Sequence, residues 1–188
     1  EEQEKRNKHI HRIKSAVNNL TNLLNEFLSI GKIEDGKIAT TNIHFNIKEL
    51  IIAICGEMEG LTKNNQHFVF THIGDEEVFS DPSLLRNVVT NLLSNAIKFS
   101  FEGSKIEISS NVLKNKIVLT IKDTGLGIST EDQAHLFERF FRGTNVTNIQ
   151  GTGLGLHIVG KYIEIMNGEI EFESELEKGT KFIITLNR

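Results

Sequence analysis

The sequence predicts an α+β fold: a two-layer α/β sandwich in which helices cover one face of a mixed sheet, preceded by a long N-terminal helix. Two patterns support this prediction. Runs of alternating apolar residues, typical of strands with one buried face, occur at 105–112, 116–122, 169–175 and 180–186. Apolar residues spaced three and four apart, typical of amphipathic helices, occur at 47–60, 81–100 and 153–167. Helices and sheets of this kind bury their apolar faces against each other.

Shorter elements are expected between these patterns. The sequence predicts strands at 43–45, 67–72 and 78–79, and a short helix at 130–138. Residues 139–152 contain few apolar side chains after Phe141, so we expect a mobile lid there.

Composition excludes several classes of protein. The chain has 188 residues and a net charge of −4, which argues against a nucleic-acid-binding protein because such proteins carry basic surfaces. No apolar run approaches the roughly 18 residues of a membrane-spanning helix. The single cysteine, Cys55, excludes an internal disulfide and suits the reducing cytoplasm. Its apolar neighbours suggest a core residue, with a catalytic thiol as the alternative.

Residues 1–36 are expected to form a helix that is distinct from the domain of residues 37–188. The apolar positions of this helix follow a heptad pattern, at Ile10, Ile13, Val17, Leu20, Leu24 and Phe27. Leu23 and Leu28 widen the apolar stripe, which favours a helical bundle over a two-stranded coiled coil. The chain begins at Glu1 with this pattern already under way, so we expect it to be a piece of a longer protein.

The helix predicted at 81–100 carries an unusual polar face. Asp81 is a good N-cap, and the proline that follows it fits the first helical position. Asn91, Asn95 and Lys98 follow an i, i+4, i+7 spacing and therefore share one narrow sector of the helix. Two amide oxygens and an ammonium group can hold a magnesium ion and the phosphates that it bridges. The alternative is an ordinary solvated helix face.

Two glycine-rich segments follow. Asp-Thr-Gly-Leu-Gly-Ile, at 123–128, comes directly after a predicted strand, and Gly-Thr-Gly-Leu-Gly-Leu, at 151–156, opens into a predicted helix. Backbone N–H groups at the start of a helix form an anion site, so a bound anion is expected at 151–156. The spacing fits neither a Walker A loop nor a Rossmann fingerprint. Between the two segments lies Phe-Glu-Arg-Phe-Phe-Arg, at 137–142.

These motifs, in this order, closely resemble the ATP-binding catalytic domain of sensor histidine kinases. The wider family includes heat-shock chaperone, mismatch-repair and gyrase ATPases. The resemblance runs from about residue 43 to the C-terminus, and residues 12–36 resemble the second helix of the kinase dimerisation domain. It implies a Bergerat ATP-binding fold, Mg2+ and ATP, and a two-component system. The implied partners are a response regulator receiver domain, an acceptor-histidine helix of the parent protein, which is membrane-anchored in some members, and a second copy through the N-terminal helix.

The first glycine segment is expected to bind adenine. Asp123 follows a strand end, where a rigid carboxylate can accept a hydrogen bond from the exocyclic amino group; an ordinary turn is the alternative. Gly125 and Gly127 are expected to provide positive φ and close approach of the purine, with Ile128 completing the turn. Phe99 either covers the base, as the resemblance implies, or fills the core.

The resemblance also implies the phosphate contacts. Asn91 and Asn95 would hold Mg2+, and Lys98 and Arg142 would hold the phosphates. Arg139 could also reach the terminal phosphate, or it is a solvated lid charge. The backbone that cradles the triphosphate would come from Gly151, Thr152, Gly153, Leu154, Gly155 and Leu156.

Asn91 separates the branches of this family. The ATPases of this family carry a glutamate one turn before the magnesium-binding asparagine, where it acts as the general base. Asn91 occupies that position here. An amide accepts a proton poorly near neutral pH, so slow hydrolysis is expected and a histidine kinase is favoured. The alternatives are a superfamily ATPase and a nucleotide-binding pseudokinase that acts as a dimerisation module.

His9 and His11 are expected to be surface residues rather than phosphoacceptors. The family's acceptor histidine precedes an acidic residue, whereas Ile10 and Arg12 follow these two. Both also lie on the helix that resembles the second dimerisation helix, so the acceptor helix is expected to lie outside this sequence.

Overall fold

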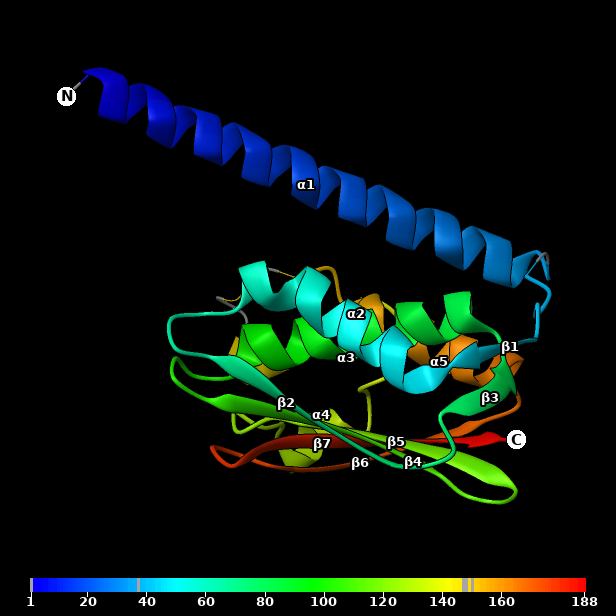
Figure 1. Cartoon of the computed structure of the whole chain (residues 1–188). Coiled ribbons are helices and arrows are strands. Elements are labelled where there is room, and N and C mark those ends of the chain that lie inside the picture. The colour runs from blue at the N-terminus through cyan, green and yellow to red at the C-terminus, as the bar shows by residue number, and fades with distance from the viewer. Residues whose placement is uncertain (1, 37, 147–148, 150) are drawn as a thin grey trace. The chain divides into compact units, whose positions relative to one another are not determined.

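The computed structural model describes residues 2–36, 38–146, 149 and 151–188. It divides into two units, Glu1–Ile38 and Ala39–Arg188. The first unit consists of one helix, α1 (Glu2–Glu34), within the range 1–36 for which a helix is predicted (Figure 1). The chain then turns at Gly36, where φ is 63°. Within the described residues, no helix is long and apolar enough to cross a membrane.

The apolar stripe of α1 is exposed in the single chain. Exposed fractions range from 50% to 66% at the heptad positions, which are Ile10, Ile13, Val17, Leu20, Leu24 and Phe27. A solvent-exposed stripe of this length is typical of a helix that pairs with another helix.

The second unit is built on a mixed sheet, as predicted, and this sheet has five strands. Its strands are β2 (His67–Gly74), β4 (Lys105–Val112), β5 (Lys116–Lys122), β6 (Glu169–Glu175) and β7 (Gly179–Asn187). Their order is β2-β4-β5-β7-β6, and only β2 and β4 pair in parallel. The alternating apolar residues of β4, β5 and β7 point to one face, where they are buried.

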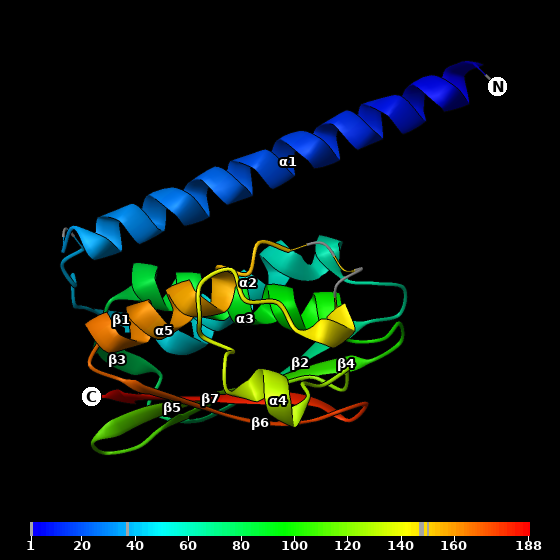
Figure 2. The same ribbon diagram turned by 180° about the vertical axis from the view of Figure 1, so that it is seen from behind.

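Three helices cover that buried face (Figures 1 and 2). They are α2 (Ile47–Met58), α3 (Pro82–Phe99) and α5 (Gly155–Ile165). α3 packs against both α2 and α5. Its apolar stripe supplies Leu85 and Leu92 to a core that also contains Ile51, Ile106 and Ile184, all at most 1% exposed. The polar face of α3 is therefore left at the surface beside α5.

A second, two-stranded sheet fixes the start of α3. β1 (Ile43–Asn46) pairs antiparallel with β3 (Glu77–Ser80). Asp81 caps α3 as predicted, because its Oδ1 atom accepts hydrogen bonds from the N–H groups of Ser83 and Leu84. Its Oδ2 atom accepts a third from Thr41 N–H at 2.7 Å. A short 3-10 helix, η1 (Glu59–Leu61), connects α2 towards β2.

Two of the predicted helices are shorter than expected. The helix predicted at 130–138 is a single turn, α4 (Thr130–Gln133), followed by tight turns up to the lid. The helix predicted from residue 153 begins at Gly155, because Gly153 has a φ of +75°, which an α-helix does not allow. The lid contains a short 3-10 helix, η2 (Thr144–Val146), and lid residues 147, 148 and 150 lie outside the described part of the chain.

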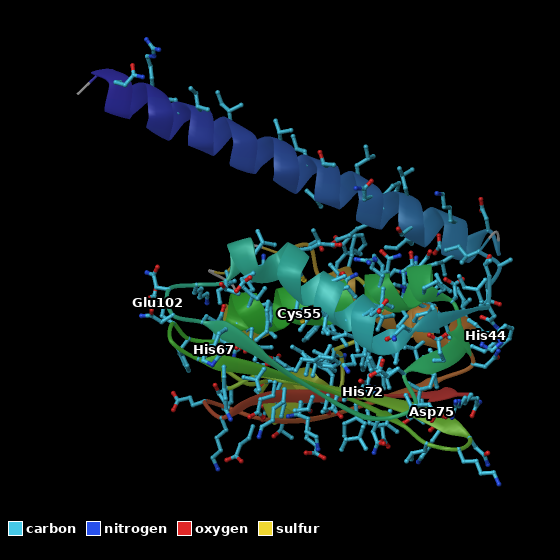
Figure 3. The ribbon with its side chains drawn as sticks, in the orientation of Figure 1. His44, Cys55, His67, His72, Asp75 and Glu102 are labelled. Atoms are coloured by element: carbon cyan, nitrogen blue, oxygen red, sulfur yellow. The ribbon has the colours of Figure 1, made fainter. Side chains whose placement is uncertain are left out.

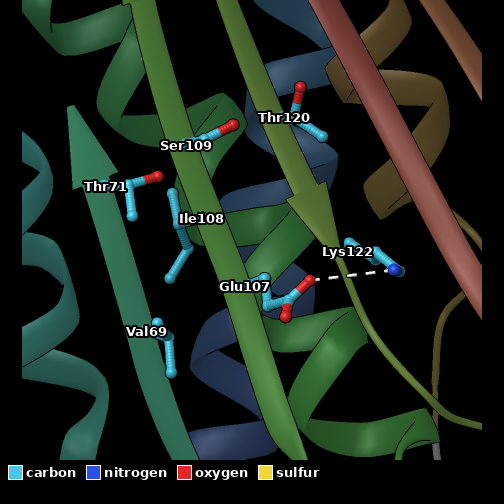
Figure 4. Close-up of a pocket in the computed structure, with 7 residues that line it drawn as sticks. All are labelled: Val69, Thr71, Glu107, Ile108, Ser109, Thr120 and Lys122. Carbon is cyan, nitrogen blue, oxygen red and sulfur yellow. Dashed lines mark ion pairs between the residues drawn. The ribbon is translucent and has the colours of Figure 1, made fainter. Parts of the chain in front are cut away.

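The other face of the sheet carries polar side chains. Figure 4 shows a shallow hollow there, between β2, β4 and β5, in which Glu107 forms an ion pair with Lys122.

Cys55 lies on α2, on the helical side of the sheet (Figure 3). It is half-buried, and burial raises the pKa of its thiol, so the neutral thiol is favoured. A neutral thiol agrees with a packing role for Cys55.

Candidate functional site

The polar face of α3 points towards the start of α5. The side-chain amide of Asn91 donates a hydrogen bond from Nδ2 to the carbonyl of Asn87 at 2.9 Å, which fixes its orientation. Its Oδ1 atom then faces Gly155, because a Cβ atom on that glycine would lie 3.0 Å from it. A side-chain oxygen is thus held beside the first residue of α5.

Lys98 lies near the second glycine segment, residues 151–156. Its ammonium group is 3.9 Å from the position that a Cβ atom on Gly151 would take. It also lies 5.9 Å from the centroid of the Phe99 ring. Asn91, Asn95 and Lys98 are all partly exposed, as the shared sector predicts. The structure therefore brings α3 together with the second glycine segment.

The start of α5 is open at its backbone. Its N-cap residue is Leu154, and no described side chain caps the first turn. Thr152 instead holds the approach to the helix, because its hydroxyl accepts a hydrogen bond from Leu154 N–H at 3.1 Å. N–H groups in the first turn of a helix lack partners within the helix and attract anions. Asn91 and Lys98 flank this region.

Asp123 lies directly after β5 and is only 7% exposed. Its Oδ1 atom accepts hydrogen bonds from Gly125 N–H at 2.9 Å and Thr180 N–H at 3.4 Å. Burial raises the pKa of this carboxyl to about 6, although these two hydrogen bonds act in the opposite direction. Asp123 is therefore a rigid acceptor that is mainly ionised at neutral pH.

The two glycines after Asp123 serve different purposes. Gly127 has a φ of +64°, as predicted, but Gly125 does not have a positive φ, and that part of the prediction is wrong. Close packing explains Gly125 instead: a Cβ atom there would lie 2.3 Å from the Phe99 carbonyl oxygen. The same carbonyl accepts a hydrogen bond from Leu126 N–H at 3.1 Å. The first glycine segment is thus fastened to the end of α3.

Two residues near Asp123 were missed by sequence reasoning. Ser100, 1% exposed, forms a β-bridge with Gly125, and its hydroxyl lies close enough to Asp123 to lower the carboxyl pKa. That hydroxyl has no hydrogen bond of normal geometry among the described residues. Thr180 follows Gly179 on β7 and donates from its backbone. The sequence could have drawn attention to Thr180, because Gly179 before it marks the turn between the last two strands. No motif in the sequence points to Ser100.

Hydrogen bonds at Ile128, the last residue of the first glycine segment, join this segment to β6. Ile128 N–H donates to the Ser174 hydroxyl at 2.9 Å. Gln133 donates from its side chain to the carbonyls of Ile128 and Ser174 at 3.0 and 3.1 Å. These bonds fix the backbone of Ile128 beside Ser174 of β6.

The two lid arginines take different positions. Arg139 donates from Nε to His157 Nε2 on α5 at 3.1 Å. Arg142 donates to the lid carbonyls of Val146, at 3.1 Å, and Ile149. Arg139 is thus attached to the helix whose N-terminus is the expected anion site, whereas Arg142 organises the lid backbone in this conformation.

Comparison with known proteins is decisive for the family. Residues 80–188, which contain α3, both glycine segments and the lid, match the model of histidine kinase-, DNA gyrase B- and HSP90-like ATPases. The chain belongs to this family. Its predicted Bergerat ATP-binding fold and its predicted similarity to histidine kinases are thereby confirmed.

Curated relatives in this family are sensor histidine kinases. The chain is 35% identical to the sensor protein GacS of Pseudomonas syringae pv. syringae, over 93% of this chain and 20% of that protein. It is 33% identical to the sensor histidine kinase RcsC of Escherichia coli K12, over 95% of this chain and again 20% of the relative. The chain thus spans about a fifth of the length of these relatives.

Solved histidine kinases share the fold. The histidine kinase AdeS of Acinetobacter baumannii superposes with a TM-score of 0.73 at 26% identity, over 91% of this chain and 79% of that chain. The catalytic domain of the histidine kinase ThkA gives 0.68 at 31% identity, over 78% and 95%. A structure of ThkA in complex with the response regulator protein TrrA gives 0.70 at 28%, over 93% and 51%.

The side-chain oxygens at the site suit a magnesium ion that also binds phosphate, rather than a metal ion coordinated by protein side chains alone. Among the residues that the structure describes, no three His, Cys, Asp or Glu side chains gather to hold a metal. The predicted oxygen ligands on α3 are the neutral side-chain amides of Asn91 and Asn95. Magnesium that is bound by few protein oxygens usually retains waters and binds substrate phosphates. The uncapped start of α5, which those phosphates would reach, lies beside Asn91.

Proposed function

We propose that residues 39–188 bind Mg-ATP and transfer its γ-phosphoryl group to a histidine on a dimerisation helix outside this sequence. One observation carries the proposal: Asn91 Oδ1 faces the uncapped start of α5. This arrangement places a magnesium ligand beside an anion site. Phosphoryl transfer depends mainly on positioning and charge neutralisation, which this geometry can provide.

The proposed residue roles follow from these positions. Asn91 and Asn95 hold Mg2+, which neutralises phosphate charge. Lys98 holds a phosphate, since its ammonium group is near Gly151. The backbone N–H groups that open α5 hold the rest of the triphosphate. Arg142 would reach the terminal phosphate only after exchanging its lid carbonyl partners for phosphate oxygens.

Asp123 is proposed to select adenine. Its carboxylate accepts a hydrogen bond from the exocyclic amino group, for which guanine has a carbonyl oxygen at the corresponding position. The Ser100 hydroxyl beside it has unused hydrogen-bonding capacity, which a purine nitrogen or a water molecule can satisfy. The half-buried Phe99 has its ring centroid 5.9 Å from the Lys98 ammonium group and its carbonyl hydrogen-bonded to Leu126 of the first glycine segment, so it can cover the base as well as pack.

Asn91 separates this proposal from the alternatives. A hydrolytic ATPase needs a base for water, and the amide of Asn91 is a poor proton acceptor. A nucleotide-binding pseudokinase that acts as a dimerisation module is disfavoured because the motifs proposed for phosphoryl transfer are intact in the sequence.

Partners are proposed from the relatives and from α1. A response regulator receiver domain is supported by the complex of ThkA with TrrA. A homodimer through α1 is supported by the exposed heptad stripe. The reducing cytoplasm is the proposed compartment, in agreement with a single, free cysteine.

A nucleotide titration tests the proposal. With Mg2+ present, calorimetry should show binding of ATP and much weaker binding of GTP. Asp123→Asn should weaken ATP binding by about 1.5–3 kcal/mol, the range for a hydrogen bond to a charged group. Failure of the wild-type chain to bind ATP would refute the proposed function. Equal ATP affinity in the variant would remove only Asp123 from the site.

A further inference from the structure

The C-terminal end of α3 is held by groups from outside the helix. The last four carbonyls of a helix lack partners within it. Here each of the four accepts a hydrogen bond, two of them from side chains that precede β2. The pairs are Ser100 N–H to Ala96 at 3.1 Å, Gln66 Nε2 to Ile97 at 3.4 Å, Lys63 Nζ to Lys98 at 2.8 Å and Leu126 N–H to Phe99 at 3.1 Å.

Lys63 makes the strongest of these contacts. Its half-buried ammonium group donates to the carbonyls of Lys98 and Ser100, at 2.8 and 2.6 Å. Charge-assisted hydrogen bonds are stronger than neutral ones, and a cation at a helix C-terminus also interacts favourably with the helix dipole. Lys63 therefore fixes the backbone on both sides of Phe99.

Gln66 fixes Lys63 in turn. The side-chain oxygen of Gln66 accepts a hydrogen bond from Lys63 N–H at 3.1 Å, and Gln66 N–H donates to the Lys63 carbonyl at 3.0 Å. Gln66 is only 5% exposed, and its Nε2 atom also donates to the Ser104 hydroxyl at 3.3 Å. This turn is consequently a rigid clamp rather than a loose connection.

The clamped backbone also carries the first glycine segment. Ser100 pairs with Gly125, and the Phe99 carbonyl accepts a hydrogen bond from Leu126 N–H. No Cβ atom fits at Gly125, because it would lie 2.3 Å from that carbonyl. A displacement of residues 98–100 would therefore be transmitted to the turn that contains Asp123.

We infer that Lys63 is a positioning residue for the nucleotide. It holds the backbone of residues 98–100, so that Lys98, Phe99 and the turn after Asp123 keep a fixed spacing. The inference rests on the proposed function, in which these groups contact the phosphates and adenine. Small misplacements of such groups have large effects on affinity, because a ligand must meet all of them at once. Lys63 itself need not contact the ligand.

The test compares three variants of the full chain. Lys63→Met removes the donor, Lys63→Arg retains a charged donor, and Lys48→Met removes a lysine ion pair with Glu76, 2.7 Å long, at the β3 end of the domain. We expect Lys63→Met to weaken Mg-ATP binding at least about tenfold, equivalent to 1.4 kcal/mol. Lys63→Arg should recover most of this loss, and Lys48→Met should retain wild-type affinity. Affinity within twofold of wild type in Lys63→Met would overturn the inference.

Hydrogen exchange without nucleotide provides a second measurement. Loss of the clamp should speed exchange of the Leu126 amide at least about tenfold, with little change at Ile184 in the centre of the sheet. Equal acceleration at both amides would indicate general destabilisation and contradict a positioning role. If Lys63→Met folds poorly, Lys63→Gln, which keeps a neutral donor, serves for the same comparison. A wild-type chain that fails to bind ATP would refute the proposed function, whereas unchanged exchange at Leu126 would refute the clamp.

Discussion

The Oδ1 atom of Asn91 lies beside Gly155, so closely that a methyl group on this glycine would come within 3.0 Å of it. This relationship joins two segments that are far apart in the sequence, the middle of α3 and the first residue of α5. It also explains why a residue without a side chain occupies the first position of α5. A larger residue there would push the amide away from the place where magnesium and the phosphates are proposed to bind.

Gly155→Ala should separate binding from stability. The added methyl group displaces Asn91, so Mg-ATP affinity should fall by about 1–3 kcal/mol, comparable to the loss of one polar contact. The unfolding temperature should not fall, because alanine is a better helix former than glycine. Calorimetry for binding and thermal unfolding for stability provide the two measurements.

Gly160→Ala is the matched control within the same helix. A Cβ atom at Gly160 would lie 3.5 Å from the Phe137 ring, which is an ordinary contact. This variant should gain stability and bind Mg-ATP like the wild type. Equal losses of affinity in both alanine variants would mean that Asn91 is not the group affected at Gly155.

The sequence predicted the fold more completely than it predicted the site. Strands such as β4 and β5 alternate cleanly because one face is buried, and periodicity detects that arrangement. It cannot detect tertiary contacts made through the backbone. The close approach of Gly125 to Phe99 and the lysine cap at Lys63 depend on segments that meet only in the folded chain. The helix predicted at 130–138 ends after a single turn, at Gln133, and its later residues form turns that precede the lid.

Asp123 should make the stability of the nucleotide-free chain depend on pH. Its folded pKa of about 6 exceeds the unfolded value of 3.8, because burial disfavours the charged carboxylate. The protonated form is therefore favoured by folding. The resulting stabilisation is complete below about pH 4 and is lost as the pH rises through 6, a difference of about 3 kcal/mol.

Asp123→Asn tests this dependence, because an amide does not titrate in that range and its oxygen can still accept hydrogen bonds from Gly125 and Thr180. Denaturant unfolding at about pH 4.5 and about pH 7.5, which lie on either side of the folded pKa, should show a smaller change in the variant than in the wild type. Identical pH profiles for the two proteins would place the titration elsewhere.

Leu20→Glu should weaken self-association through α1. Leu20 is 66% exposed in the middle of the heptad stripe, and its burial in a helix pair would contribute about 1.5–3 kcal/mol. Sedimentation velocity should therefore show a dimer for the wild type and a dissociation constant at least about tenfold higher for the variant. Asn25→Glu, at an exposed position off the stripe, is the matched control and should leave association unchanged. A wild-type chain that remains monomeric at high concentration would contradict the dimer.

The final prediction concerns the phosphoacceptor. His9 is exposed on α1, while the side chain of His11 lies outside the described residues. Neither histidine is followed by the acidic residue expected after an acceptor. With labelled ATP, this chain should therefore acquire no stable phosphate of its own. It should phosphorylate a separately supplied acceptor domain of its parent protein, slowly and in proportion to acceptor concentration, because no tether raises the effective concentration.

Two sets of variants make this test specific. Asn95→Ala removes a proposed magnesium ligand and should abolish transfer to the acceptor domain, whereas combined His9→Ala and His11→Ala should have no effect. The measurement is label retained under alkaline conditions, which preserve phosphohistidine. Label on the chain alone that disappears in the double histidine variant would show that the acceptor lies on α1. Transfer that persists in Asn95→Ala would remove this residue from the magnesium site, because a phosphoryl donor without its bridging cation leaves the charge on the phosphates uncompensated.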